Sequence, residues 1–156
     1  MKNLQALVLA GLLVMGFAGD TKSAEICGVE IPAQKFVGKD IEREGFYKGE
    51  WEVLLVNQLG SKKTRLCSGL QILDVSDSKV QYLYVWGNNP DMKLSKGYSE
   101  KTSPLKENLF YFEFKKSRFL FEFKDKSRIV GKEGSSSIEY KKLNWTKIKI
   151  LNPEEI

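Results

Sequence analysis

The sequence predicts an all-β fold, an antiparallel up-and-down barrel of about eight strands, with a β-sandwich as the alternative. Two observations lead to this prediction. From Gly45 onwards, runs with alternating apolar side chains recur about every ten residues, separated by turns rich in Gly, Asn, Asp and Ser. No segment there has the spacing of a long amphipathic helix. The apolar face must therefore be buried against a second sheet or inside a closed one.

The strongest signal is the stretch 109–124, LFYFEFKKSRFLFEFK, in which phenylalanines occupy every second position of two runs. A period of two is typical of strands with one buried face. With a connection over Lys115–Arg118, the two runs form a hairpin with opposed rings on one face. The predicted ring pairs are Phe114 with Phe119, Phe112 with Phe121, and Phe110 with Phe123.

The other elements follow from the same reasoning. Turn composition is found at Gly60–Lys63 and Asp74–Lys79, and Gly69 predicts a bulge or a close approach of chains. Residues 33–43 favour a short helical turn, whereas residues 92–104 predict a long loop with at most one short strand. We expect further strands over Ile26–Ile31, Glu52–Val56, Leu66–Val75, Val80–Trp86, Arg128–Glu133, Ser137–Leu143 and, at an edge, 147–150.

The first residues have the composition of an export signal. Lys2 precedes an apolar run over Leu4–Ala18, which is shorter than the ~20 residues of a membrane-spanning helix. The small residues Ser23 and Ala24 predict a cleavage site. We therefore expect residues 1–24 to be a signal peptide and residues 25–156 to be a single β-barrel domain, with no membrane span, that acts in the periplasm or outside the cell.

Cys27 and Cys67 are the only cysteines of the chain. In an oxidising compartment two cysteines most simply pair with each other. The predicted disulfide closes a loop of about 40 residues, which corresponds to about 4 kcal/mol of stabilisation in the chain-entropy description.

The sequence argues against an enzyme. It contains no histidine, which removes Ser-His-Asp and Cys-His nucleophiles, histidine zinc sites and imidazole bases. It also lacks the glycine-rich phosphate loops, the nucleophile elbow and the C-x-x-C motif. A hydrolase based on carboxylates is the remaining enzymatic alternative, but Glu113 and Glu122 are expected on a solvated face. We expect no metal and no cofactor.

The formal net charge is +5. The basic residues are scattered over turns and exposed faces rather than gathered in a stripe, so we expect no nucleic-acid partner.

An interior lined by tyrosine and phenylalanine offers flat apolar surface, which suits a small apolar or aromatic ligand unless the rings pack against each other. We therefore expect an exported, non-enzymatic binding protein with a ligand site in the barrel mouth; the oligomeric state is left open. The expected ligand-binding residues are Tyr82, Tyr84, Trp86, Asn88, Phe112 and Phe121.

The alternative is an interaction module for a cell-envelope polysaccharide or protein. The loop after Trp86 has side chains that hydrogen-bond sugar hydroxyls, namely those of Asn88, Asn89 and Asp91. Trp86 or Tyr98 would stack on a sugar ring.

Two short motifs resemble known families. Gly49-Glu50-Trp51 resembles the opening of lipocalin-like (calycin) barrels, and the meander that follows, with its disulfide-tied N-terminus, is similar to theirs. The resemblance implies an up-and-down barrel. The chain lacks the family's threonine–aspartate–tyrosine motif, and its last strand offers Lys141 and Lys142 where the family has an arginine. Separately, the stretch from Tyr84 to Pro90 resembles a tyrosine–tryptophan–glycine–x–x–proline stretch of small exported bacterial β-domains of unassigned role.

Overall fold

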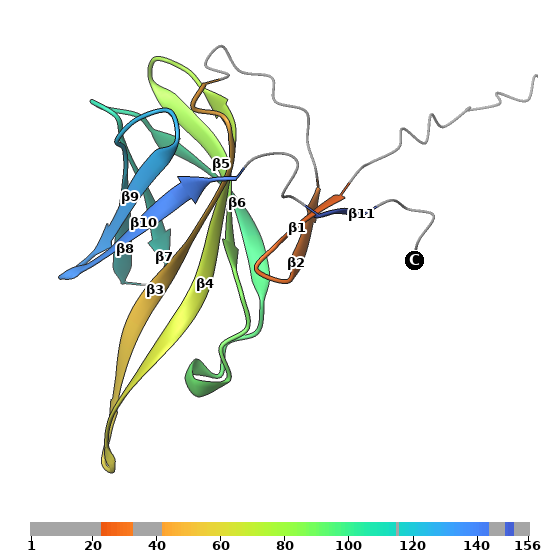
Figure 1. The fold of residues 1–156 in the computed structure, drawn as a ribbon. Helices are drawn as coiled ribbons and strands as arrows, with labels where there is room; N and C mark the ends of the chain where they lie inside the picture. Colours follow the sequence, from red (N-terminus) through yellow and green to blue (C-terminus); the bar gives the residue numbers. More distant parts are fainter. Residues whose placement is uncertain (1–22, 33–41, 115, 144–148, 152–156) are drawn as a thin grey trace, which may run out of the picture.

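The computed structural model describes residues 23–32, 42–114, 116–143 and 149–151 (Figure 1). An eight-stranded antiparallel sheet curls into a nearly closed barrel, and a three-stranded sheet lies on its outside. The elements are β1 Ser23–Ile26, β2 Val29–Pro32, β3 Gly45–Asn57, β4 Gly60–Val75, β5 Lys79–Trp86, the 3-10 helix η1 Pro90–Met92, β6 Gly97–Pro104, β7 Leu109–Phe114, β8 Ser117–Phe123, β9 Arg128–Glu133, β10 Ser136–Lys142 and β11 Lys149–Leu151.

The barrel strands form an up-and-down meander. Their order is β6-β5-β4-β3-β10-β9-β8-β7, so β10 pairs with β3 and the seam lies between β6 and β7. Two side chains bridge this seam. The Tyr111 backbone N–H donates to Ser103 Oγ at 2.9 Å, and the Tyr82 hydroxyl donates to the Tyr111 carbonyl at 2.8 Å. The predicted barrel is confirmed, and the sandwich is not the architecture adopted.

One continuous apolar cluster fills the barrel interior. Its rings touch each other: the centroids of Phe110 and Phe121 lie 5.1 Å apart, those of Tyr82 and Phe110 5.2 Å. Tyr82 and Phe121 are completely buried. The buried members of the cluster are Tyr47, Trp51, Leu66, Leu70, Ile72, Val75, Val80, Tyr82, Tyr84, Phe110, Phe112, Phe121, Phe123, Ile129, Ile138 and Tyr140.

The phenylalanine hairpin forms, but its predicted register is wrong by two residues. β7 ends at Phe114 and β8 already begins at Ser117, so Phe114 faces Ser117 rather than Phe119. A two-residue connection matches the twist of an antiparallel ribbon better than the four residues assumed. Because the shift is even, all six rings keep their common face. The observed ring pairs are Phe110 with Phe121 and Phe112 with Phe119.

Several other boundaries differ from the prediction. The expected turn Gly60–Lys63 lies inside β4, which starts at Gly60, and the expected loop over 92–104 contains the whole of β6. Both segments are polar, and neither has the alternation of a half-buried strand. The expected strand Ile26–Ile31 is a hairpin, β1 and β2. Its turn residues Cys27 and Gly28 both have positive φ, as a tight two-residue turn requires.

Two expectations lie wholly or partly outside the described residues. The helical turn over 33–43 falls almost entirely on residues that the structure does not describe. Of the expected edge strand 147–150, the described part belongs to β11, which pairs with β1 rather than with the barrel.

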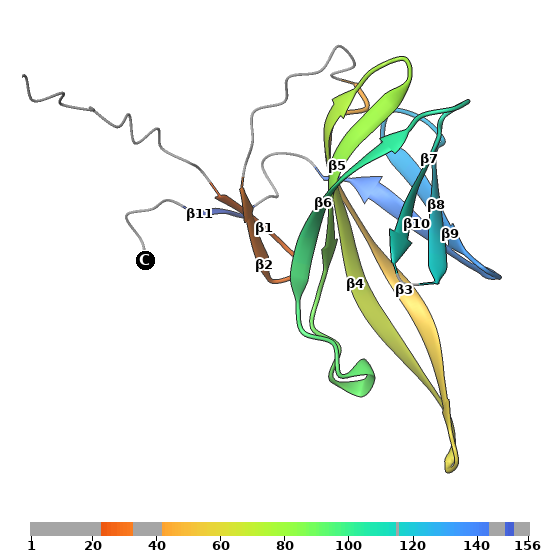
Figure 2. The ribbon, with the colours of Figure 1, turned by 180° about the vertical axis from the view of Figure 1, so that it is seen from behind.

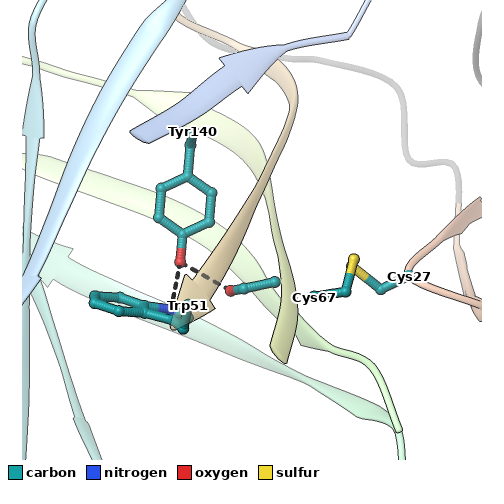
Figure 3. The surroundings of a disulfide bond; sticks show 5 residues. Cys27, Trp51, Cys67 and Tyr140 are labelled. Atoms are coloured by element: carbon teal, nitrogen blue, oxygen red, sulfur yellow. Dashed lines mark hydrogen bonds between the residues drawn. A yellow bond between two sulfur atoms is a disulfide. The ribbon is translucent and has the colours of Figure 1, made fainter. Parts of the chain in front are cut away.

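Trp51 links the first strand of the barrel to the last (Figure 3). Its indole N–H donates to the Tyr140 hydroxyl at 3.0 Å, and this hydroxyl shares a hydrogen bond of 2.8 Å with the hydroxyl of Ser68. Burial raises the pKa of the Tyr140 phenol well above its usual value, so the hydroxyl stays protonated. The last strand thus supplies a polar partner for Trp51, and this partner is Tyr140 rather than Lys141 or Lys142.

The three-stranded sheet β11-β1-β2 covers the outer face of the barrel beside β4 and β5 (Figure 2). Ala24, Ile26, Val29 and Ile31 are buried there in a second apolar cluster. Gly69 allows the approach, because a Cβ at this position would lie 2.5 Å from Ile26 Cγ2. The close approach predicted at Gly69 is therefore confirmed, while the bulge in this strand lies between Ile72 and Asp74. The remaining members of this buried cluster are Phe46, Leu73, Leu83 and Val85.

The predicted Cys27–Cys67 disulfide is confirmed (Figure 3). It joins the β1–β2 turn to β4 across a sequence separation of 40 residues, with the two Cα atoms 5.6 Å apart. The small sheet is therefore fixed to the barrel both covalently and by its buried apolar side chains.

Reduction of this disulfide should destabilise the fold. Because an open chain regains the entropy of a loop of about 40 residues, we expect a loss of about 4 kcal/mol and a melting temperature lower by roughly 10 °C. Thermal melts followed by circular dichroism, with and without reductant, measure the difference. The Cys27→Ser/Cys67→Ser variant should have the melting temperature of the reduced protein, and reductant should not change it. Equal melting temperatures for the oxidised and reduced protein would contradict this account.

Candidate binding site

Polar groups cover the end of the barrel near Arg43. The Tyr47 hydroxyl donates to the Arg43 carbonyl at 2.8 Å, and Lys142 Nζ donates to the Glu42 carbonyl at 2.7 Å. The Arg43 guanidinium lies over the Phe123 ring, 5.2 Å from its centroid. A pocket of about 280 Å³ at this end is accordingly lined mainly by charged and polar side chains: Glu42, Arg43, Asn108, Phe123, Lys124, Asp125 and Lys126.

At the opposite end the aromatic rings reach the solvent. Tyr84 stacks on Phe112 with 4.8 Å between centroids, and Phe112 stacks on Phe114 at 6.3 Å and an interplanar angle of 19°. Tyr84 and Phe112 are buried, whereas Phe114 is 53% exposed. Phe119 lies beside this stack, 5.7 Å from Phe112 and 5.7 Å from Trp51. We call Phe114, Phe119 and Trp86 the aromatic rim; buried Phe112 lies directly beneath it.

Trp86 fastens the following loop to this end. Its indole N–H donates to the Ser95 carbonyl at 2.8 Å, and its ring centroid lies 6.1 Å from that of Tyr84. The ring also covers Gly97 on β6, where a Cβ would come within 2.8 Å of it. Trp86 is half-buried, so part of the indole contributes to the surface of the rim and part holds the loop in place.

The asparagine side chains of the loop after Trp86 form hydrogen bonds within the protein. Asn89 is 2% exposed, and its amide nitrogen donates to Thr64 Oγ1 at 3.1 Å and to the Arg65 carbonyl at 3.0 Å. The amide oxygen of Asn88 accepts from the Lys96 N–H at 2.7 Å. The Asn89 bonds brace the loop against β4, and the Asn88 bond joins the two ends of the loop. A sugar would have to compete with these bonds for the asparagine side chains.

The predicted ligand-binding residues divide into two groups. Tyr82, Tyr84, Phe112 and Phe121 come together as expected, but in the packed core of the barrel. Burial raises the pKa of the phenols of Tyr82 and Tyr84, so both stay neutral. Trp86 lies at the rim.

Asn88 lies outside this aromatic cluster, in the exposed loop. The sequence prediction missed Phe114 and Phe119 as rim residues, because the wrong turn length placed both in a buried pair.

A second hollow of about 430 Å³ lies beside the seam, at the β6–β7 connection. The Arg118 guanidinium lies 4.9 Å from the centroid of the Tyr111 ring on this outer face of β7. Leu109 and Leu120 are each 43% exposed here. The residues that line the hollow are Pro104, Lys106, Glu107, Leu109, Phe110, Tyr111 and Leu120.

The two carboxylates considered for glycoside chemistry are engaged in ion pairs. Glu113 pairs with Arg118, and Glu122 pairs with Lys124 at 2.6 Å. Among the residues that the structure describes, no group of three or more Cys, Asp and Glu side chains is placed to hold a metal ion. No helix in the same described ranges is long and apolar enough to cross a membrane.

The rim and the core should respond differently to truncation. Phe121→Ala removes a ring with no exposed surface and should cost about 3–5 kcal/mol of unfolding free energy. Phe114→Ala removes a ring that is 53% exposed, so we expect a cost of about 1 kcal/mol or less. Urea denaturation of both variants measures the contrast. Similar losses for the two variants would show that Phe114 is part of the core.

Comparisons with known proteins leave the chain without an assigned family: no family model, no curated protein and no solved structure matches it.

Proposed function

We propose that this chain is an exported, non-enzymatic binding protein whose aromatic rim takes a small apolar or aromatic group. The observation that supports this proposal is the ring stack that runs from buried Tyr84 through Phe112 to exposed Phe114. A flat apolar group stacks on such rings through burial of its surface and through ring–ring contacts.

The packing of the barrel supports the rim over the interior as the place of binding. A ligand inside the barrel would have to displace side chains such as Phe110 and Phe121, which are buried and in contact. Protein interiors are close-packed, so this displacement would cost several kcal/mol. At the rim, Phe114 is exposed and Phe119 and Trp86 are half-buried, so a ligand can contact these rings without opening the core.

Recognition of a cell-envelope polysaccharide or protein through the loop after Trp86 is the less supported alternative. The side chains of Asn88 and Asn89 already form hydrogen bonds within the chain. Asp91 accepts from Lys62 Nζ at 2.7 Å. A sugar would have to replace these bonds rather than add to them.

Binding of an apolar fluorescent probe, anilinonaphthalene sulfonate, tests the rim. We expect the folded protein to bind the probe, and Phe114→Ala to weaken binding by about fivefold because one ring contact is lost. Trp86→Ala should weaken binding as well, since it removes the half-buried indole. Fluorescence titration gives the dissociation constants, and native mass spectrometry of the purified protein shows any ligand carried over from the cell.

Leu109→Ala is the matched control, because Leu109 is 43% exposed at the other end of the same strand. Its affinity for the probe should equal that of the unaltered protein. If Phe114→Ala and Leu109→Ala bind the probe equally well, or if the folded protein binds no probe, the rim is not the site.

Export is supported by the disulfide, since such bonds persist in oxidising compartments. The position of Ala24 in β1 argues against signal-peptide cleavage directly after it. Ala24 is fully buried and pairs with Ile31 and Ile150 in the small sheet. Cleavage after Ala24 would remove half of β1, whereas cleavage after Ala18 would leave it intact. Gly16 and Ala18 supply the small residues that a signal peptidase requires.

We therefore expect the exported protein to begin at Gly19 rather than at Glu25. Intact mass spectrometry of protein recovered from the periplasm or the medium distinguishes the two starting points. A chain that begins at Glu25 would show that the small sheet forms without the first half of β1. A full-length chain held in the membrane would contradict export as a soluble protein.

A further inference from the structure

The β3–β4 hairpin projects beyond the barrel, at the end that carries the aromatic rim (Figures 1 and 2). β10 pairs with β3 only at Tyr47 and Lys48, and β5 pairs with β4 only from Ser68 onwards. From Gly49 on β3 and before Ser68 on β4, the two strands pair only with each other and form a two-stranded ribbon. Asn57 at its tip lies six residues beyond Trp51, which corresponds to roughly 20 Å of extended chain.

Three apolar side chains are exposed at or near the tip of this ribbon, beside the polar side chains of Asn57, Gln58 and Ser61. Leu54 is 57% exposed, Val56 75% and Leu59 97%. Leu59 occupies the two-residue turn itself, where Asn, Asp or Gly is usual. Isolated exposed apolar residues are normal on a protein surface, but three on one projecting tip form a concentrated apolar surface.

Basic residues lie just behind this tip. Residues 54–63 contain Lys62 and Lys63 and no carboxylate. Lys63 faces Leu54 and Lys62 faces Leu55 across the ribbon, about 10 Å from the turn. The side chain of Lys62 is 66% exposed and that of Lys63 is 72% exposed.

The helix η1 adds to the same surface. The ion pair between Asp91 and Lys62, 2.7 Å long, holds it against the ribbon. Met92 of η1 is 37% exposed, and Lys93 follows it at the surface.

We propose that this tip docks the protein on an anionic lipid surface. Val56 and Leu59 enter the boundary between headgroups and acyl chains, where interfacial segments bury their apolar face to a depth of about 5–10 Å. Lys63 and Lys93 then reach the level of the lipid phosphates, and their apolar stems lie along the headgroup region, while Lys62 stays paired with Asp91. The spacing between the apolar turn and the lysines matches this depth.

Two features favour a lipid surface over a protein partner. The tip projects beyond the barrel (Figure 1) and is formed by β3 and β4 alone, so it offers little area for a protein interface of ordinary size. The ion-pair partner of Lys63 is Glu52, at 2.6 Å, and Glu52 lies farther from the turn than the lysine does. The Glu52 backbone is therefore farther from the lipid than that of Lys63, and on docking Lys63 exchanges this exposed carboxylate for a lipid phosphate. The anchor is independent of the ligand proposed for the rim.

Vesicle binding tests the anchor. The processed protein, with its disulfide formed, is mixed with vesicles of phosphatidylcholine alone or of phosphatidylcholine with phosphatidylglycerol, and co-sedimentation is measured. We expect binding to the anionic vesicles, weakened by salt. Leu59→Asp should reduce the affinity by at least about tenfold, because a charge replaces a side chain that would be buried. Lys93→Glu should reduce it by about fivefold or more.

Leu120→Asp is the matched control, since Leu120 is 43% exposed on β8, away from the ribbon. It should bind vesicles like the unaltered protein. Insertion is followed with Leu59→Trp, whose added fluorescence should shift to shorter wavelength and be quenched by brominated acyl chains. Leu120→Trp should show neither effect. Circular dichroism confirms that each variant is folded.

Several outcomes would overturn the proposal. Equal vesicle binding by the Leu59→Asp and Leu120→Asp variants would do so, as would an unchanged Leu59→Trp spectrum. If the unaltered protein sediments as a dimer that Leu59→Asp dissociates, the tip joins two copies of this chain instead. If the folded protein binds neither kind of vesicle, the tip is not a lipid anchor.

Discussion

The contact between the phenylalanine rows of β7 and β8 and the tyrosines of β5 is the interaction on which the rest of the structure depends. Tyr82 and Tyr84 pack against Phe110, Phe112 and Phe121 across the barrel, which brings the two halves of the sheet together. The Tyr82 hydroxyl also bridges the seam between β6 and β7. Since these rings fill the interior, the barrel offers surfaces for binding at its ends and on its outside.

β5 is apolar on both faces, so its outward face needs a cover in addition to the barrel interior. Its tyrosines face the interior cluster, while Leu83 and Val85 face outward into the second cluster, under β1 and β2. An outward apolar face would be left in water by the barrel alone. The small sheet covers it, and the Cys27–Cys67 disulfide keeps the cover in place. The outer wall of the barrel at β4 and β5 is therefore closed, and the exposed apolar surfaces of the described residues lie at the aromatic rim, along the seam and on the tip of the β3–β4 ribbon.

The sequence was sufficient to predict which face of each strand is buried, because the alternation has a period of two. The alternation does not show which residues of the neighbouring strand lie opposite. It could not predict the register of the phenylalanine hairpin, which depends on turn length and strand twist. For residues 92–104 it predicts a long loop with at most one short strand, whereas β6 covers Gly97–Pro104. The strand has no apolar alternation, and Ser103 is its one buried residue. The apolar run Leu54–Val56 predicts an ordinary barrel strand. Only the pairing shows that it projects beyond its neighbours, since a projecting strand and a buried one have the same local sequence pattern.

An isolated two-stranded ribbon is at best marginally stable in water, so its projection from the barrel requires support. The loop after Trp86 provides it. Buried Asn89 binds Thr64 and the carbonyl of Arg65 on the ribbon, and Asp91 pairs with Lys62. The same loop is fixed to the barrel end by the Trp86 indole. The residues that resemble a recognition loop in sequence thus act chiefly as a brace between the aromatic rim and the ribbon. The two surfaces share one support, and the orientation of the ribbon relative to the rim depends on it.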